Sequence, residues 1–397
     1  MAMVKLVRFG ALALLLSGPA WAQQTTPSAD NGGQVPALVP RSHEERESRY
    51  RAAHRVILNA LVTDRSGKPV TGLKADDFTV LDNGKPQKLA AFRAVAGSEG
   101  IAPVRVILML DAVNNSPKDL AGDHKGVERF LRQSPRNLAY PTSIGILTGA
   151  GTTVSEPSRD SDAVIGELSR LTRTVHLYDC SDMGGGSDQV FATINVKTGS
   201  TIAEGQRPDE KTGCQNERFH HSVSALKKLV VAQENEQGRA ILIWIGRGWP
   251  LLLSREFRDD TPGVKQNQFD NLVLISNALR EAQVTLDSVF SPDLFRHVEL
   301  RSDHDNRLFN GVPTEREMTA SSLGLQMLGH QSGGLVLIDG KDLAAEIGMC
   351  VQDAESYYAL SFDTAPAAPP NEFHSLEVKT NDPSLTVRTN TDYYAEP

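Results

Sequence analysis

Asp111, Asn114 and Asn115 follow directly after a run of apolar residues at 104–110. Carboxylate and amide oxygens of this kind are the hard donors that a divalent cation such as Mg²⁺ prefers. An apolar strand that ends in a polar loop before a helix is how an open α/β sheet presents a ligand site at its carboxyl edge. Asp111 and Asn115 are therefore the candidate metal ligands, whereas Val113 between them has no atom that can coordinate a cation.

A second polar segment follows another apolar run, at 240–245, where Arg247 and Trp249 come directly after the run. If both runs are strands of one sheet, Arg247 lies at the same edge as Asp111. Its guanidinium would then repel a cation and could pair with the carboxylate instead. We therefore expect no metal cofactor, with Mg²⁺ at this edge as the alternative. Five residues make up the expected recognition patch: Asp111, Asn114, Asn115, Arg247 and Trp249.

Trp249 has two interpretations. As an exposed ring beside Arg247, it would be an aromatic anchor for a partner, because tryptophan is among the residues that dominate interface energetics. As a core residue, it would pack beneath the loop and contact no partner. The sequence leaves both interpretations open.

The sequence lacks the motifs of serine hydrolases, zinc hydrolases and nucleotide-binding loops. Ser, His and Asp are plentiful, but a Gly-x-Ser-x-Gly elbow is missing. His220 and His221 do not belong to a His-Glu-x-x-His pattern, so zinc hydrolysis lacks its ligands. The glycines at 184–186 lack the Lys and Ser or Thr of a nucleotide-binding loop. We therefore expect a non-catalytic protein, and an envelope hydrolase whose residues converge only in three dimensions is the alternative.

The elements that must position these residues alternate from residue 104 onwards. Apolar runs of strand length recur along this part of the chain, at 104–110, 143–148, 240–245, 283–290 and 335–338. Helical patterns with one apolar face lie between these runs. Such alternation predicts an α/β fold with a doubly wound, mostly parallel sheet. A polar, glycine-rich stretch at 181–213 is expected to be an insertion within this domain, which spans 100–352.

Strand patterns also flank the α/β domain on both sides, at 52–98 and at 356–394. In the first segment, Asn83 and Gly84 supply the positive φ values of a tight hairpin turn. Neither segment has enough strands to bury a sheet face alone. We therefore expect the two segments to pack together as one β-sandwich, and two separate ribbons are the alternative.

The amino terminus has the pattern of a secretory signal peptide. Lys5 and Arg8 precede a short apolar run, and residues 20–22 form a small-x-small cleavage pattern. The run is too short to span a bilayer, and no later segment approaches 18 uninterrupted apolar residues, so no transmembrane segment is expected. We predict a signal peptide at 1–22, a disordered linker at 23–51, and export to the periplasm or beyond the cell.

Charge and cysteine content narrow the possible partners and compartment. The net charge of −8 argues against nucleic acid, because no basic stripe is present to neutralise phosphates. The three cysteines fit an oxidising compartment. Cys180 and Cys214 bracket the insertion, and a disulfide between them would contribute about 3–4 kcal/mol; three free thiols are the alternative. Cys350 lies on an expected helix and is expected to be unpaired.

Taken together, these segments resemble the VWFA-related family described from acidobacterial genomes. The resemblance covers most of the chain after residue 51 and is carried by the turns and strands at 62–73, 77–86, 104–111, 238–244, 329–334 and 357–360. It implies a von Willebrand A-type fold, a three-layer, Rossmann-like α/β sandwich carried between β segments. The family's members are mostly uncharacterised, so the resemblance implies binding or adhesion outside the cytoplasm and no chemistry.

The resemblance also implies where a metal would bind. In a von Willebrand A domain the first strand ends in Asp-x-Ser-x-Ser, and here Val113 and Asn115 stand at the serine positions. The second loop should supply a Thr, for which Thr172 and Thr174 are the nearest candidates, and the third loop carries Arg247 where an acidic residue is expected.

We therefore interpret the site as a degenerate metal-ion-dependent adhesion site in an exported binding protein. Its expected ligand is an unknown protein or peptide. A Mg²⁺-dependent adhesion domain and a structural subunit that assembles through its β edges are further alternatives.

Overall fold

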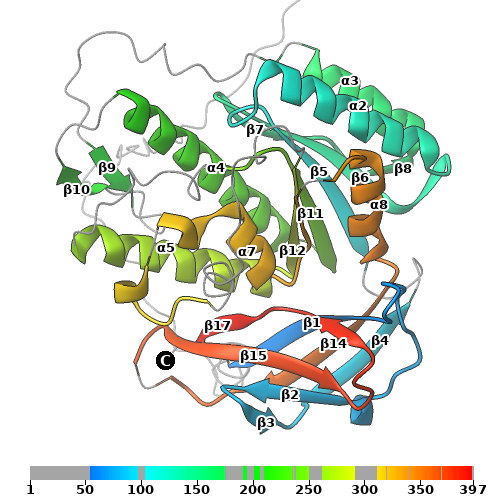
Figure 1. The fold of residues 1–397 in the computed structure, drawn as a ribbon, viewed down its shortest axis with the longest axis vertical. Helices are drawn as coiled ribbons and strands as arrows, with labels where there is room; N and C mark the ends of the chain where they lie inside the picture. The colour runs from blue at the N-terminus through cyan, green and yellow to red at the C-terminus, as the bar shows by residue number, and fades with distance from the viewer. Residues whose placement is uncertain are drawn as a thin grey trace, which may run out of the picture. The chain divides into compact units, whose positions relative to one another are not determined.

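The computed structural model (Figure 1) describes residues 54–96, 103–173, 175, 191–194, 201–205, 210–234, 236, 238–249, 262–290, 311–318, 320–338, 340–367 and 369–395. The predicted signal peptide at 1–22 and linker at 23–51 lie outside the described residues. The chain divides into Met1–Arg46 and Glu47–Pro397, and everything described below belongs to the second unit.

Within the described residues, the centre of the fold is a seven-stranded sheet. Its strands are β5 (Val104–Asp111), β6 (Asn137–Thr148), β7 (Gly151–Val154), β8 (Ser158–Asp160), β11 (Arg239–Ile245), β12 (Val284–Phe290) and β13 (Val336–Ile338). Strands β13, β12, β11, β5 and β6 are parallel neighbours in that order. The short strands β7 and β8 pair with β6 in the antiparallel sense.

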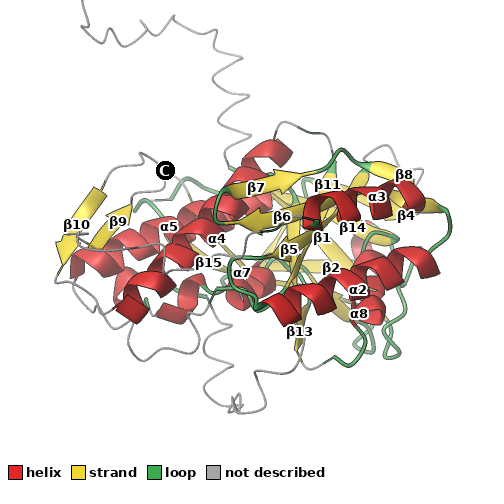
Figure 2. Cartoon of the chain, turned by 90° about the horizontal axis from the view of Figure 1, so that it is seen from above, coloured by secondary structure: helices red, strands yellow, loops and turns green. Residues whose placement is uncertain are grey.

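Helices cover both faces of this sheet (Figures 1 and 2). One face is covered by α2 (Pro117–Gln133), α3 (Ser161–Thr172) and α8 (Leu343–Gln352), and the other by α4 (Glu210–Glu234), α5 (Pro262–Glu281) and α7 (Leu325–Gln331). Because strand side chains alternate, β11 serves both cores: Ile243 faces the α2 side, whereas Leu242 and Trp244 face the α4 side. The outcome is a three-layer α/β arrangement.

Short elements complete this part of the chain. Strands β9 (Phe191–Ile194) and β10 (Thr201–Gly205) form an antiparallel pair within the expected insertion. Because α4 begins at Glu210, its first residues also belong to that predicted range. Among the described residues, short 3-10 helices lie at η4 (Glu315–Glu317) and η5 (Ala320–Leu323) and, in the amino-terminal β segment, at η1 (Ala75–Asp77).

The flanking segments form two four-stranded antiparallel sheets. One sheet has the order β16 (Thr386–Arg388), β1 (Arg55–Thr63), β14 (Ser356–Asp363), β4 (Ala91–Ala96). The other has the order β17 (Asp392–Ala395), β15 (Glu372–Thr380), β2 (Phe78–Asp82), β3 (Lys85–Gln87). Each sheet contains strands from the segment before the α/β domain and from the segment after it, and one apolar core lies between the sheets. The two segments therefore make one sandwich rather than separate ribbons.

The register of the sandwich follows from its apolar alternation. Leu58 pairs with Leu360 across β1 and β14, and Val80 pairs with Val378 across β2 and β15. All four side chains are buried in the sandwich core. The β2–β3 hairpin turns at Asn83 and Gly84, whose φ angles of 48° and 75° are the positive values expected of this pair.

At the level of architecture, the expected fold is confirmed: the chain is mixed α/β, with a parallel-rich central sheet and flanking antiparallel sheets. None of the helices in the described part of the chain combines the length and apolar character needed to cross a bilayer.

Candidate functional site

Asp111 ends β5 at the carboxyl edge of the central sheet and is completely buried. Its Oδ1 accepts hydrogen bonds from the backbone N–H groups of Val113 at 3.1 Å and Asn114 at 2.9 Å. Its Oδ2 accepts from Asn114 Nδ2 at 2.7 Å and from the indole Nε1 of Trp244 at 3.0 Å. The amide of Asn114 also donates to Ser222 on α4, at 2.9 Å. Asp111 is therefore surrounded by hydrogen-bond donors from two parts of the fold, the loop that follows β5 and the strand β11.

These donors fill the carboxylate's acceptor sites. A carboxylate offers about four lone-pair positions, and four donors from the protein occupy them at Asp111. Burial raises the pKa of Asp111, while the hydrogen bonds from Asn114, Trp244 and Val113 oppose that rise. The Trp244 donor was missed by sequence reasoning, because an apolar strand pattern gives no sign that an indole N–H will meet a carboxylate.

Asn115 joins helix α2 to the loop that follows β11. Its Nδ2 donates to Asp123 Oδ2 at 2.6 Å, and its Oδ1 accepts from the backbone N–H of Arg247 at 2.9 Å. Asp123 is 2% exposed and was not among the predicted site residues. Burial, and then the charges of Asp119 and Asp111, raise the pKa of Asp123 to about 7. The Asn115 side chain therefore links α2 to the loop that follows β11.

Arg247 pairs with Asp119 rather than with Asp111, so the predicted Asp111–Arg247 pair is wrong. The guanidinium lies 2.5 Å from Asp119 Oδ2, and the side chains are 25% and 19% exposed. Asp119 is held in place because the α2 N-cap, Ser116, donates its Oγ proton to the same oxygen at 2.6 Å. Asp111 is out of reach of such a pair because its acceptor positions are already filled by buried donors.

Trp249 is buried, with 2% of its surface exposed, so its interpretation as an exposed anchor is wrong. Its Nε1 donates to the backbone carbonyl of Leu323 at 2.5 Å, and its ring packs edge-on against Trp244 at 5.3 Å between centroids. The alternative, in which Trp249 packs beneath the loop, matches the structure. The positive φ of Gly246 (134°) and Gly248 (64°) lets the loop turn inwards.

The side chains expected to bind a cation make other contacts in this structure. Val113 is fully buried and apolar, and Thr172 Oγ1 donates to the Leu168 carbonyl at the end of α3. Asn115 and Asp111 are engaged in the contacts described above. Thr174 lies outside the described residues. Within the described residues, no group of three or more His, Cys, Asp or Glu side chains is placed to hold a metal ion.

The cysteines are described in part. Cys214 at the start of α4 is disulfide-bonded, and Cys350 on α8 is a buried free thiol. Cys180 lies outside the described residues, so the predicted Cys180–Cys214 pairing stays a prediction.

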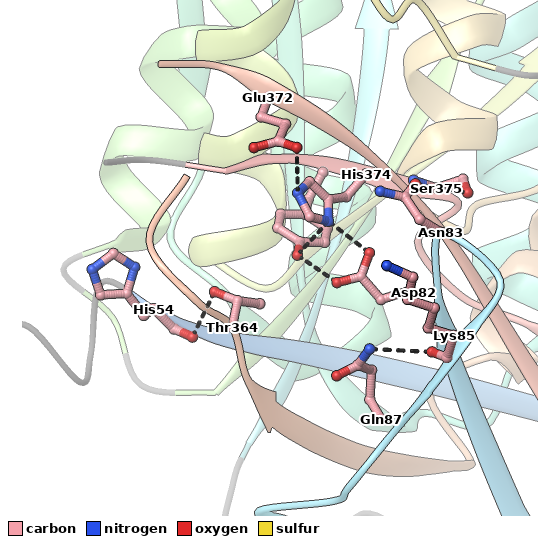
Figure 3. A network of polar contacts seen from close by, with 10 residues as sticks. His54, Asp82, Asn83, Lys85, Gln87, Thr364, Glu372, His374 and Ser375 are labelled. Carbon is pink, nitrogen blue, oxygen red and sulfur yellow. Dashed lines mark hydrogen bonds and ion pairs between the residues drawn. The ribbon is translucent and has the colours of Figure 1, made fainter. Parts of the chain in front are cut away.

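A second polar cluster lies in the β-sandwich (Figure 3). The Nδ1 of His374 on β15 is 2.6 Å from Asp82 Oδ1 and 3.1 Å from the hydroxyl of Tyr393. That hydroxyl donates to Asp82 Oδ2 at 2.9 Å, which closes a three-membered ring of contacts. The other ring nitrogen of His374 faces Glu372 Oε1 at 3.9 Å. Sequence reasoning missed this cluster, because Asp82 lies 292 residues from His374 and 311 residues from Tyr393 in the chain.

This ring stabilises the sandwich. Tyr393 is 2% exposed, and burial followed by the charge of Asp82 raises its pKa, so the phenol stays protonated. The arrangement satisfies three polar groups at the end of a β core.

Comparisons with known proteins leave the family open. No protein-family model matches the chain, and no curated protein matches it. Solved structures that match include manganese-loaded Plasmodium vivax TRAP protein, with 11% identity, a TM-score of 0.33, and coverage of 75% of this chain and 96% of that one. The human COPII-coat protein Sec24c matches with 9% identity and a TM-score of 0.33, over 74% of this chain and 44% of that one.

A third match is to three N-terminal domains of the type V pili tip protein Mfa5 from Porphyromonas gingivalis. It has 10% identity and a TM-score of 0.19, over 49% of this chain and 26% of that one. With identities and TM-scores this low, none of the three matches carries an argument about function.

Proposed function

We propose that this chain is a non-catalytic binding protein that recognises a protein or peptide partner through the loops at the carboxyl edge of its central sheet. These loops are residues 112–119 and 246–249, called the edge loops below. The single observation that carries the proposal is the environment of Asp111, whose four hydrogen bonds come from the protein itself. We propose in addition that recognition needs no Mg²⁺.

The accessible chemistry of the edge loops supports a polar contact with the partner. In open α/β sheets, ligands bind outside the carboxyl ends of the strands. At this edge Asp111 and Trp249 are buried, whereas Arg247 and Asp119 remain partly exposed at 25% and 19%. A partner would therefore meet a guanidinium and a carboxylate fixed by Asn115 and Ser116. Pre-positioned charges of this kind give specificity and orientation more than affinity.

Capture of partners from envelope extract tests the proposal. Immobilised wild-type protein is compared with an Asp119→Ala/Arg247→Ala variant, each in Mg²⁺ and in EDTA, with bound proteins identified by mass spectrometry. The expected result is one set of proteins that the wild type captures equally in both buffers and the variant loses. The matched control is Glu167→Ala/Arg170→Ala, which removes an exposed ion pair on α3 and should leave capture unchanged.

Two outcomes contradict the proposal in different ways. Capture that requires Mg²⁺ would support the metal-dependent alternative, and a wild-type melting temperature that rises with Mg²⁺ would support it independently. Capture that survives in the Asp119→Ala/Arg247→Ala variant would place recognition elsewhere on the molecule. Turnover of general ester or peptide substrates that is lost in a His374→Asn variant would favour the hydrolase alternative.

We also propose that the protein is exported, to the periplasm or beyond the cell. The support is the sequence pattern at 1–22, which lies outside the described residues. Fractionation of expressing cells, followed by amino-terminal sequencing of the mature protein, tests this. A mature protein that begins near Gln23 is expected, and a cytoplasmic chain that still begins at Met1 would contradict it.

A further inference from the structure

The β-sandwich is joined to the α/β layers by its last strand. Asn277 on α5 makes reciprocal hydrogen bonds with the backbone of Tyr394 on β17, at 2.8 and 3.2 Å. Directly before β17, the backbone N–H of Thr391 donates to the carbonyl of Gln331 on α7, at 3.2 Å. An α-helix therefore covers the edge of β17 that would otherwise pair with another strand.

A second connection is made by Arg388 on β16. Its guanidinium contacts both carboxylate oxygens of Asp353 at 2.7 Å and donates to the carbonyl of Gly333 at 2.8 Å. Residues 388–394, together with their partners on α5, at 331–333 and at Asp353, form what we call the seam. The seam adds these polar contacts to apolar ones between the sandwich and the α/β layers, where the Tyr394 ring packs against Phe269 of α5.

Buried polar atoms without a hydrogen-bond partner gather at the seam and beside it: Gln331 Nε2, Thr389 Oγ1, Asp392 Oδ1 and Asp287 Oδ2. A buried polar atom without a partner lowers the stability of the fold, and an ionised carboxylate lowers it further. The two carboxylates are therefore the most consequential members of this set.

Asp392 begins β17 and is 4% exposed. Its Oδ2 accepts one hydrogen bond, from Thr391 Oγ1 at 3.1 Å. Among the described residues, no Lys, Arg or His side chain forms an ion pair with Asp392, and the titratable group that acts on it from its own strand is Tyr394. Burial raises the pKa of Asp392 to about 7.

Strand β15 and helix α5 pack on β17 and bring charged groups close to it. Ser375 on β15 stands opposite Asp392 in the register, and Glu372 and His374 lie further along β15, where His374 is bound to Asp82. From α5, the Arg280 guanidinium lies over the Tyr393 ring, at 5.8 Å from its centroid. Among the described residues, these charged groups engage other partners, and Asp392 accepts a single hydrogen bond, from the Thr391 hydroxyl.

Asp287 on β12 is completely buried and lies beside the Asp353–Arg388 ion pair. Its Oδ1 accepts from the backbone N–H of Leu335 at 2.7 Å. Burial and the charge of Asp353 raise the pKa of Asp287 to about 7, whereas Arg388 and Arg239 oppose that rise. The Cys350 thiol also lies against Asp287 and is in side-chain hydrogen-bond contact with its carboxyl group.

We propose that the seam is a proton-controlled contact: with Asp287 and Asp392 neutral it holds β16 and β17 against the α/β layers, and with both ionised it opens locally. A neutral carboxyl can be buried with one hydrogen bond, but an unpaired carboxylate has to regain water. Because Asp392 lies on the strand that α5 covers, the easiest route to water is for β17 to separate from α5. This inference does not depend on the proposed edge-loop function.

Hydrogen exchange of the whole protein between pH 6.0 and 8.5 tests the proposal. After correction for the intrinsic pH dependence of exchange, the β17 amides should lose about tenfold or more of their protection across this range. Amides of β11 should keep theirs. In an Asp287→Asn/Asp392→Asn variant, protection of β17 should no longer depend on pH. Asp76→Asn, at an exposed position of the sandwich, is the matched control and should behave like the wild type.

A wild-type profile that is flat for β17, or one that persists in the double variant, overturns the proposal. If the double variant does not fold, carbonyl-¹³C NMR of the wild type replaces it. The Asp392 and Asp287 carboxyl resonances should then titrate over the same pH range in which β17 loses protection. Titration in a different range overturns the proposal as well.

Discussion

Asp111 and Asp392 are both buried, but their hydrogen-bonding environments are opposite. Asp111 accepts four hydrogen bonds: from the backbone N–H groups of Val113 and Asn114, from the Asn114 side-chain amide and from the Trp244 indole. Asp392 meets one hydroxyl and has an oxygen with no partner. Burial raises the pKa of both, but at Asp111 several hydrogen bonds oppose the rise and at Asp392 a single one does.

The difference shows that burial alone does not decide what a carboxylate can do. A carboxylate whose acceptor positions are filled by protein donors supports the proposal that the edge loops bind a partner without a cation. A carboxylate left with one donor is tolerated mainly in its neutral form. One region is thereby suited to constant recognition and the other to a response to pH.

Removing the carboxylate of Asp111 should have the largest effect on stability. Asp111→Ala leaves four donors without an acceptor in a buried place, so we expect the free energy of unfolding to fall by about 3 kcal/mol or more. Urea unfolding measures this. Glu167→Ala, which removes a surface ion-pair partner, is the control and should change stability by about 1 kcal/mol or less. A loss at Asp111 no larger than the control would remove the contrast between the two carboxylates.

Asp392 should make stability fall as pH rises. Its pKa of about 7 in the folded state is higher than that of an unfolded aspartate, so the folded state binds more protons between about pH 4 and 7. The free energy of unfolding therefore declines over this window and levels off above it. In Asp392→Asn this decline should shrink by roughly 2–3 kcal/mol between pH 5 and 8, as urea unfolding at each pH would show. An unchanged slope would mean that Asp392 finds a partner when it ionises.

The architecture could be predicted because it depends on patterns that the chain repeats. The near-continuous apolar runs at 104–110 and 240–245 match β5 and β11 closely, since strands of a parallel sheet are buried on both faces. The pairing of the two flanking segments could be predicted because neither segment alone has enough strands to form a sheet with a buried face. Both inferences use many residues at once.

The site could be predicted only as a location. The apolar run predicts that Asp111 ends a strand, as it does in β5, but the partners of Asp111 and Asn115 depend on single contacts. Asp119 and Asp123 are four residues apart on α2, which puts both on one helix face. Two acids on the face that also buries neighbouring apolar residues were a readable signal of a polar cluster beneath the loop. No pattern of this kind could have revealed the Trp244 N–H.

Changes at Trp249 should have an effect on stability between those at Asp392 and Arg247. Its buried ring packs on Trp244 and anchors residues 246–249 to the core. Trp249→Phe removes the hydrogen bond to the Leu323 carbonyl and leaves that acceptor buried, so we expect a loss of about 1–2 kcal/mol in urea unfolding. Met349→Ala, at a side chain that is 49% exposed, is the control and should be close to neutral. A neutral Trp249→Phe variant would indicate that solvent reaches the carbonyl and that the loop is open.

Arg247 should give the smallest change in stability and thereby separate recognition from folding. Its ion pair with Asp119 is partly exposed, and pairs of this kind are worth about 1 kcal/mol or less and weaken in salt. A double-mutant cycle with Arg247→Gln and Asp119→Asn should therefore give a small, salt-sensitive coupling in urea unfolding. If the coupling instead exceeds about 2 kcal/mol, the pair serves the fold, and any loss of partner capture in its variants could come from a distorted loop. A small coupling together with lost capture would assign these two side chains to the partner, because the protein would have kept its structure.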